Sequence, residues 1–391
     1  MDFKKLTEYI DSLSEVYGVP AADIKITKNH ETVYRHSAGY SDYKKMRPVS
    51  EHDLYRLYSA TKVVTMTAVM QLIERGELGL YDALTDYFPE FSKLRVADSV
   101  NITGFPIPWP DSNTACHLAH DTIRIIDLMS MTAGLSYDME SEHLKAIKKS
   151  NGQATTSEVI AEIAKMTLLF EPRTRWSYGL SHDVLAGVVE QVTGFSFGEY
   201  IQQNIFQPLE INDFYLKIDE HVQKRLSGLY QAEQGSEILL SDQGGFGNSF
   251  QVTENFESGG AGLIGTVDAY SKFVDALSCG GVGANGNRIL TEDSIKMFST
   301  NYTVGQQLED FKTMEKVGYG YGLGVRVLID QTKSKTPLGE FGWDGAAGAY
   351  AVIDPFNHIS IFYAQHILGF PIVYNEIHPK LRDLAYEAMG F

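Results

Sequence analysis

The stretch from Ser59 to Arg75 is the feature that most limits what this chain can fold into. Its residues are apolar at nearly every helical position, and Gly76 follows where a helix C-cap would stand. It is too short to span a membrane, which takes about 20 apolar residues, and Thr65 and Gln71 interrupt it. A helix that is apolar on all sides needs cover on all sides, so the sequence predicts a helix buried between layers.

Strand patterns that could cover this helix lie near the two ends of the chain. Near the N-terminus, an amphipathic helix is predicted over residues 4–16, and the polar residues 28–31 separate two alternating runs in a hairpin pattern. These two runs, three later strands and a closing helix are predicted at 24–27, 32–40, 321–328, 349–353, 359–363 and about 374–388.

The middle of the chain has mainly helical patterns, notably at 122–131 and 181–192. We therefore predict two domains. Residues 1–80 and 255–391 form a discontinuous α/β domain, residues 81–254 form an inserted, mainly helical domain, and the active site lies at their junction. The loops at 96–120 and 229–258 are expected to shape the mouth of that site.

Charge and cysteine content exclude several classes of function. The 391 residues carry 33 basic and 50 acidic side chains, a net charge of -17, which disfavours binding to nucleic acid or to an anionic membrane surface. No apolar run typical of a secretory signal follows Met1, so we expect a cytoplasmic protein. The two cysteines, Cys116 and Cys279, fit a reducing compartment and exclude a structural zinc site unless histidines and carboxylates supply it.

Ser59-Ala60-Thr61-Lys62 places a serine and a lysine three residues apart at the first turn of the buried helix. That spacing puts both side chains on one helical face, next to the free N–H groups and the positive end of the helix dipole. Burial would lower the pKa of Lys62, so that its neutral amine could take the proton of the Ser59 hydroxyl. The alternative is that Ser59 is an ordinary helix N-cap.

Two other serines match nucleophile patterns without the context that catalysis needs. Ser41 and Lys44 also have the serine-lysine spacing, but they lie in a polar stretch that starts no helix. Ser196 lies in Gly194-Phe195-Ser196-Phe197-Gly198, a pattern that should follow a strand, whereas the residues before it read as a helix. We interpret Ser196 as part of a turn between helices.

Several segments together resemble the serine β-lactamase and penicillin-binding superfamily, above all the class C β-lactamases and the family VIII carboxylesterases. The resemblance extends in order over nearly the whole chain. It implies a β-lactamase-like fold of the α/β plus all-α class, with an antiparallel sheet flanked by helices. The segments that carry it are residues 55–62, 71–78, 123–135, 176–178 and 259–263.

The family's second motif is a tyrosine followed two residues later by an asparagine, and Tyr178-Gly179-Leu180 matches it in part. The resemblance implies that Tyr178 shares a proton with Lys62 and Ser59, as base in acylation and as activator of water afterwards. Leu180 replaces the asparagine and offers no hydrogen bond to an amide of the substrate.

The third motif is a lysine-threonine-glycine strand in lactamases, and Trp343-Asp344-Gly345 is the better match here than Lys335-Thr336-Pro337. Trp343 then replaces the lysine that holds a substrate carboxylate, as in family VIII esterases. The resemblance implies that the N–H of Ala346 joins that of Ser59 in an oxyanion hole and that Gly345 leaves room for the acyl group.

These observations predict a serine hydrolase that works through an acyl-enzyme, without a metal or an organic cofactor. The loss of two polar contacts, at positions 180 and 343, favours a carboxylesterase acting on small neutral esters of short or medium acyl chain. A β-lactamase or D-amino-acid peptidase, an acyltransferase, and a non-catalytic binding protein are the alternatives.

Overall fold

The computed structural model describes residues 1–233, 237–240 and 252–391. Its main feature is an eight-stranded antiparallel sheet, in the order β11-β12-β13-β14-β15-β1-β2-β3. The strands are β1 (Ala21–Lys28), β2 (Glu31–Asp42), β3 (Arg47–Pro48), β11 (Tyr319–Tyr321), β12 (Arg326–Leu328), β13 (Phe341–Gly342), β14 (Tyr350–Asp354) and β15 (Ile359–Ala364). The predicted fold class is confirmed.

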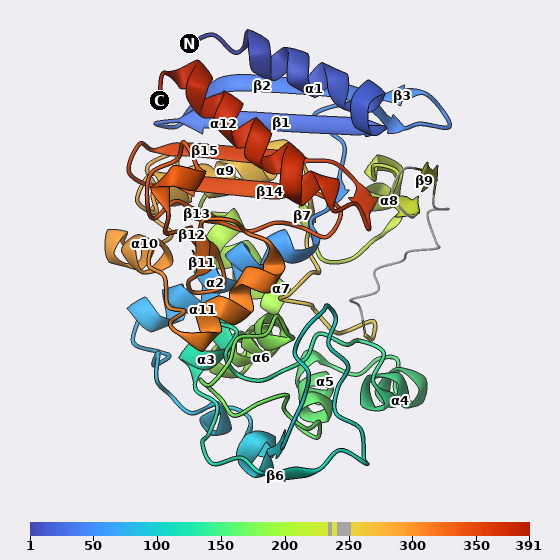
Figure 1. The fold of residues 1–391 in the computed structure, drawn as a ribbon, viewed down its shortest axis with the longest axis vertical. Coiled ribbons are helices and arrows are strands. Elements are labelled where there is room, and N and C mark those ends of the chain that lie inside the picture. Colours follow the sequence, from blue (N-terminus) through green and yellow to red (C-terminus); the bar gives the residue numbers. More distant parts are fainter. Residues whose placement is uncertain (234–236, 241–251) are drawn as a thin grey trace.

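The centre of the sheet joins the two ends of the chain. Strand β1 pairs with β15, with Ile26 opposite Ile361, so that the first and the last strands of this sheet lie side by side (Figure 1). Alternate residues of the strands face opposite sides. Val352 and Ile361 pack against helices α1 (Lys4–Tyr17) and α12 (His378–Met389), whereas Ile353 faces α9 (Val267–Ser278) and the main core.

The prediction of one strand over 321–328 is wrong. The chain turns between β11 and β12, which pair with each other, and Tyr321 lies opposite Arg326. Gly324 adopts a φ of +76°, and a Cβ there would come within 2.2 Å of Met66 Cγ. The turn therefore packs directly on the buried helix, which requires glycine at this position.

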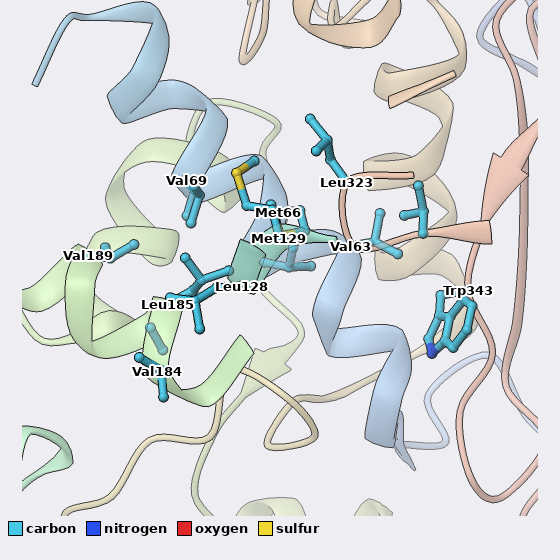
Figure 2. Packing of buried hydrophobic residues seen from close by; sticks show 14 of the residues in the cluster. Val63, Met66, Val69, Leu128, Met129, Val184, Leu185, Val189, Leu323 and Trp343 are labelled. Atoms are coloured by element: carbon cyan, nitrogen blue, oxygen red, sulfur yellow. The ribbon is translucent and has the colours of Figure 1, made fainter. Parts of the chain in front are cut away.

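The buried helix is α2 (Thr61–Glu74), and its residues from Thr61 to Leu72 are all buried. It packs against α6 (Ser181–Thr193) and α7 (Phe197–Ile201). Figure 2 shows this core, with Leu128 and Leu185 from the helical side and Trp343 from the sheet side. One hydrophobic cluster thus extends from the helices through α2 to the sheet, and the predicted domain boundaries remain a prediction.

The remaining elements are short. Five strands, β5 to β9, lie within residues 81–254, where the strand pattern of the sequence was weak. The loop predicted at 229–258 falls partly outside the described residues. These other elements are β4 (Tyr55–Arg56), β5 (Arg95–Ala97), β6 (Cys116–Leu118), β7 (Phe214–Tyr215), β8 (Tyr230–Glu233), β9 (Glu237–Leu240), β10 (Ile264–Gly265), β16 (Ile367–Leu368), α3 (Ile125–Met129), α4 (Glu142–Ser150), α5 (Thr156–Ile163), α8 (Glu220–Arg225), α10 (Glu292–Phe298) and α11 (Gln306–Phe311).

Two general expectations can be compared with the fold. Among the described residues, no helix is both long enough and apolar enough to cross a bilayer. Cys116 and Cys279 are both free thiols.

Because α2 holds the layers together, truncating a side chain at its contact with α6 should be costly. We expect Leu185→Ala to lower the free energy of unfolding by about 2–5 kcal/mol, since Leu185 is fully buried and its loss leaves a cavity. Leu338→Ala is the matched control, because Leu338 is 50 % exposed, and it should change stability by less than about 0.5 kcal/mol. Urea unfolding of both variants measures the difference, and equal losses would contradict this account of the core.

Candidate active site

Ser59 lies in a short 3₁₀ turn, Tyr58–Ala60, that leads directly into α2. The residue in the N-cap position of α2 is Ala60, and no side chain caps the helix, so the alternative interpretation of Ser59 as an N-cap is wrong. Tyr58 has a φ of +45°, an uncommon conformation for a non-glycine residue. This turn exposes Ser59 to a cavity while the helix behind it stays buried.

The Lys62 ammonium group is fully buried next to the Ser59 hydroxyl. Its Nζ lies 3.1 Å from Ser59 Oγ, 3.3 Å from the Tyr137 hydroxyl and 2.7 Å from the carbonyl oxygen of Gly260. Burial lowers the pKa of Lys62 to about 7, although the carboxylate of Asp183 opposes this shift. A pKa near neutrality favours the neutral amine far more than an exposed lysine does, and the neutral amine has a lone pair for the Ser59 proton.

Two tyrosines flank the serine and the lysine. The rings of Tyr137 and Tyr178 are stacked, with centroids 5.3 Å apart, and Lys62 Nζ lies 4.9 Å and 4.6 Å from their respective centroids. Burial raises the pKa of both hydroxyls, against hydrogen bonds with Ser59 that lower it. Both tyrosines are therefore phenols at neutral pH, which favours Tyr178 as a proton donor over Tyr178 as a phenolate base.

Sequence reasoning missed Tyr137. It lies two residues after the 123–135 segment that carries the family resemblance, but nothing in its neighbourhood distinguishes it from the other 21 of the 22 tyrosines. Its position beside Lys62 depends on tertiary structure, since 75 residues separate the two in sequence.

The glycines of the 259–262 segment allow the chain to approach α6. A Cβ on Gly260 would lie 2.5 Å from Asp183 Oδ2, and one on Gly259 would lie 2.5 Å from the His182 carbonyl oxygen. The Asp183 carboxylate accepts hydrogen bonds from the Ser258 hydroxyl, at 2.5 Å, and from the Gly260 N–H, at 3.1 Å. These contacts hold the Gly260 carbonyl against Lys62, and they identify Asp183 as a second residue that the sequence did not reveal.

Trp343 contacts Tyr178 directly. Its indole Nε1–H donates a hydrogen bond of 2.9 Å to the Tyr178 hydroxyl, and the two rings stack with centroids 5.5 Å apart. The one N–H of the indole is therefore used within the site and is not free to bind a substrate carboxylate.

The segment 344–346 lies against the backbone that precedes Ser59. A Cβ on Gly345 would come within 2.3 Å of the Leu57 carbonyl oxygen. The packing of the backbone therefore requires glycine here, whether or not an acyl group also needs the space. The Tyr374 hydroxyl donates to the carbonyl oxygens of Gly345 and Ala346, at 2.9 and 2.8 Å. Ala346 lines the same cavity as Ser59.

Leu180 lies apart from this cavity. It is only 1 % exposed, its backbone N–H donates to the Ser136 carbonyl oxygen, and it belongs to the main hydrophobic core. Leu180 is absent from the cavity lining, although the sequence analysis assigned it to substrate binding.

The cavity in front of Ser59 has a volume of about 380 Å³, and aromatic rings line part of its wall. Lys316 also lines it, but the ammonium group is paired with the buried Asp344 carboxylate, whose second oxygen accepts a 3.0 Å hydrogen bond from Arg326. Burial raises the pKa of Asp344, but these cations outweigh it and lower the pKa to about 2. The other lining residues that the site uses are Phe105, Tyr137, Tyr178, Trp343, Ala346 and Tyr374.

The two alternative serines have structural roles. Ser196 caps α7, because its hydroxyl accepts from the Glu199 N–H while the Glu199 side chain accepts from the Ser196 N–H. The Ser41 hydroxyl is fully buried and donates to the carbonyl oxygens of Arg47 and Pro48 at 3.3 Å.

Known proteins resemble this chain over most of its length. Protein Rv1367c of Mycobacterium tuberculosis is 28 % identical over 84 % of the chain and 81 % of its own length. Esterase EstB of Burkholderia gladioli is 26 % identical over 92 % of the chain and 89 % of its own length. The solved structure of EstCE1, described as a hydrolase with promiscuous acyltransferase activity, superposes with a TM-score of 0.78 and 23 % identity, covering 98 % of both chains.

The family model named Beta-lactamase matches residues 6–371, which include Ser59, Lys62, Tyr178 and Trp343. The chain belongs to the Beta-lactamase family.

Proposed function

We propose that this protein is a carboxylesterase that hydrolyses small neutral esters through an acyl-enzyme on Ser59. The observation that carries the proposal is the 3.1 Å contact between Ser59 Oγ and the fully buried Nζ of Lys62, beside a cavity that aromatic rings line in part. The esterase relatives support the same reaction class.

In the proposed reaction, Ser59 Oγ attacks the ester carbonyl and its proton passes to the neutral amine of Lys62. The N–H groups of Ser59 and Ala346 stabilise the oxyanion, in which one donor contributes about 10²–10³ in rate. The Tyr178 phenol gives a proton to the leaving alkoxide and recovers one from Lys62. Water then attacks the acyl group, its proton passes to Lys62 by way of Tyr178, and Ser59 is released with its proton restored.

The charge of the cavity favours a neutral substrate. Lys316 is the one cationic lining residue, and its pairing with Asp344 leaves no free positive charge for a substrate carboxylate among the described lining residues. A lactamase site would have a lysine for the substrate carboxylate at the position of Trp343. We still expect the protein to be located in the cytoplasm.

Acyl transfer is the second candidate. The acyl-enzyme on Ser59 reacts equally with an alcohol that enters the cavity, and EstCE1 carries out both reactions according to its description. Product analysis with added alcohols separates the two, because transfer yields a new ester and hydrolysis yields the acid.

Removing the nucleophile should abolish the reaction. We expect Ser59→Ala to lower kcat for p-nitrophenyl butyrate by at least about 10³-fold, because Ser59 is the group that forms the acyl-enzyme in the proposed reaction. Ser196→Ala is the control and should keep wild-type turnover, losing only about 1 kcal/mol of stability as a helix cap. A fluorophosphonate probe should label Ser59 by mass spectrometry, and full activity of Ser59→Ala would refute the assignment.

The pH profile should report the ionisation of Lys62. Because only the neutral amine accepts the Ser59 proton, kcat/KM should rise with pH through about 7. The Asp183 carboxylate stabilises the ammonium form and so raises the pKa of Lys62 against the effect of burial. Asp183→Asn, which keeps an oxygen for Ser258 and Gly260, should therefore move this limb to lower pH, and a shift to higher pH would contradict the assignment.

The Tyr178 hydroxyl should be needed for proton transfer to the leaving group. We expect Tyr178→Phe to lower kcat by about 10²–10⁴-fold, the usual contribution of general acid catalysis. Trp343→Phe keeps an aromatic ring but removes the N–H bonded to Tyr178, so kcat should fall less than in Tyr178→Phe. Steady-state kinetics with p-nitrophenyl acetate measure both, and wild-type kcat in Tyr178→Phe would exclude it as the donor.

A further inference from the structure

Three potential metal ligands meet at the end of the molecule opposite the two termini, beside β6 (Figure 1). Glu171 Oε1 lies 2.9 Å from His117 Nε2 and 3.2 Å from His120 Nδ1. In a tetrahedral zinc site with bonds of about 2.0–2.2 Å, neighbouring ligand atoms are about 3.3–3.6 Å apart. The spacing to His120 is close to this range, and the spacing to His117 must lengthen by about 0.4 Å or more to admit one zinc ion.

His117 has a carboxylate at each ring nitrogen. Its Nδ1 lies 2.6 Å from Asp98 Oδ1, while Nε2 faces Glu171. A neutral imidazole has only one N–H, so it can donate to only one of these carboxylates. The other nitrogen needs either an additional proton or a metal ion. With a metal on Nε2, the Nδ1–H remains for Asp98, which is the carboxylate-histidine-metal arrangement of many zinc sites.

The backbone also orients the third ligand. The N–H of His120 lies 3.2 Å from both oxygens of Glu171, which directs the carboxylate toward the two rings. Two neutral imidazoles and two carboxylates leave a net negative charge that a divalent cation neutralises. Two imidazoles with one carboxylate form a donor set typical of zinc, with a fourth position for water.

We propose that His117, His120 and Glu171 bind one zinc ion and that Asp98 orients His117. The two cysteines excluded a structural zinc site unless histidines and carboxylates supplied its ligands, and the ligands proposed here are of that kind. The site is separate from the proposed esterase chemistry, because none of these four residues lines the cavity at Ser59.

The consequence concerns the loop of residues 98–115. Asp98 begins this loop, and its end runs into β6, which contains His117 and pairs with β5. The loop carries Phe105 into the active-site cavity, where its ring centroid lies 5.6 Å from that of Tyr178. A metal on His117 and Glu171 would therefore fix the base of the loop that forms one wall of the cavity.

The test uses tag-free full-length protein that has been stripped with a chelator. A second group, His30, Asp275 and Cys279, could also hold an ion, so the measurements are made in a His30→Ala background. We expect one equivalent of Zn²⁺ to bind by calorimetry and one of Co²⁺ to give the visible absorption of a tetrahedral site. His120→Ala should weaken Zn²⁺ binding by at least about 100-fold, and Asp98→Asn by about 10–100-fold.

The control is His143→Ala. It removes an exposed histidine on α4, outside the proposed site, and should leave zinc binding unchanged. His120 is 79 % exposed, so its replacement should not disturb folding. Wild-type zinc affinity in His120→Ala would overturn the site, as would loss of all zinc binding on changing His30 alone. Zinc should also slow hydrogen exchange in residues 98–115, and unchanged exchange with zinc bound would refute the effect on the loop.

Discussion

The contact on which the site depends is between the buried amine of Lys62 and the carbonyl oxygen of Gly260, at 2.7 Å. A lysine inside an apolar helix is costly unless its polar hydrogens are satisfied or its charge is lost. Three acceptors surround Lys62 Nζ and satisfy its hydrogens. Burial also lowers the pKa of Lys62 to about 7, which favours loss of its charge. The same burial that makes α2 the centre of the core thus lowers the pKa of Lys62, as the proposed role of its neutral amine as a base requires.

The fold supplies these acceptors from distant parts of the chain. Gly260 precedes β10 and Tyr137 follows α3, whereas Ser59 lies in the 3₁₀ turn directly before α2. The contact with Gly260 depends on the packing of α6 against α2, since Asp183 on α6 holds the N–H of Gly260. The resemblance carried by residues 259–263 has a physical reason, because side chains on the first two glycines would collide with α6.

The sequence was sufficient for the part of the site that lies within one helical turn. Ser59 and Lys62 are three residues apart, so helix geometry alone places them together. Tyr178 and Trp343 required the family resemblance, and Tyr137 and Asp183 were missed because their proximity to Lys62 is tertiary. The long strand at 321–328 was wrong although Gly322 and Gly324 already indicated a break, since glycines inside a strand often mark a bend.

The polar groups around the cavity are largely bonded to one another. The Trp343 N–H is bonded to Tyr178, the Asp344 carboxylate to Lys316 and Arg326, and the Tyr374 hydroxyl to two backbone carbonyls. Each of these bonds fixes the shape of the wall and removes a group that could recognise a polar substituent. If the proposed esterase reaction is correct, recognition of a substrate depends mainly on its size and apolar surface, and the backbone N–H groups at Ser59 and Ala346 determine where its carbonyl oxygen lies. The cavity of about 380 Å³ then limits the size of the ester.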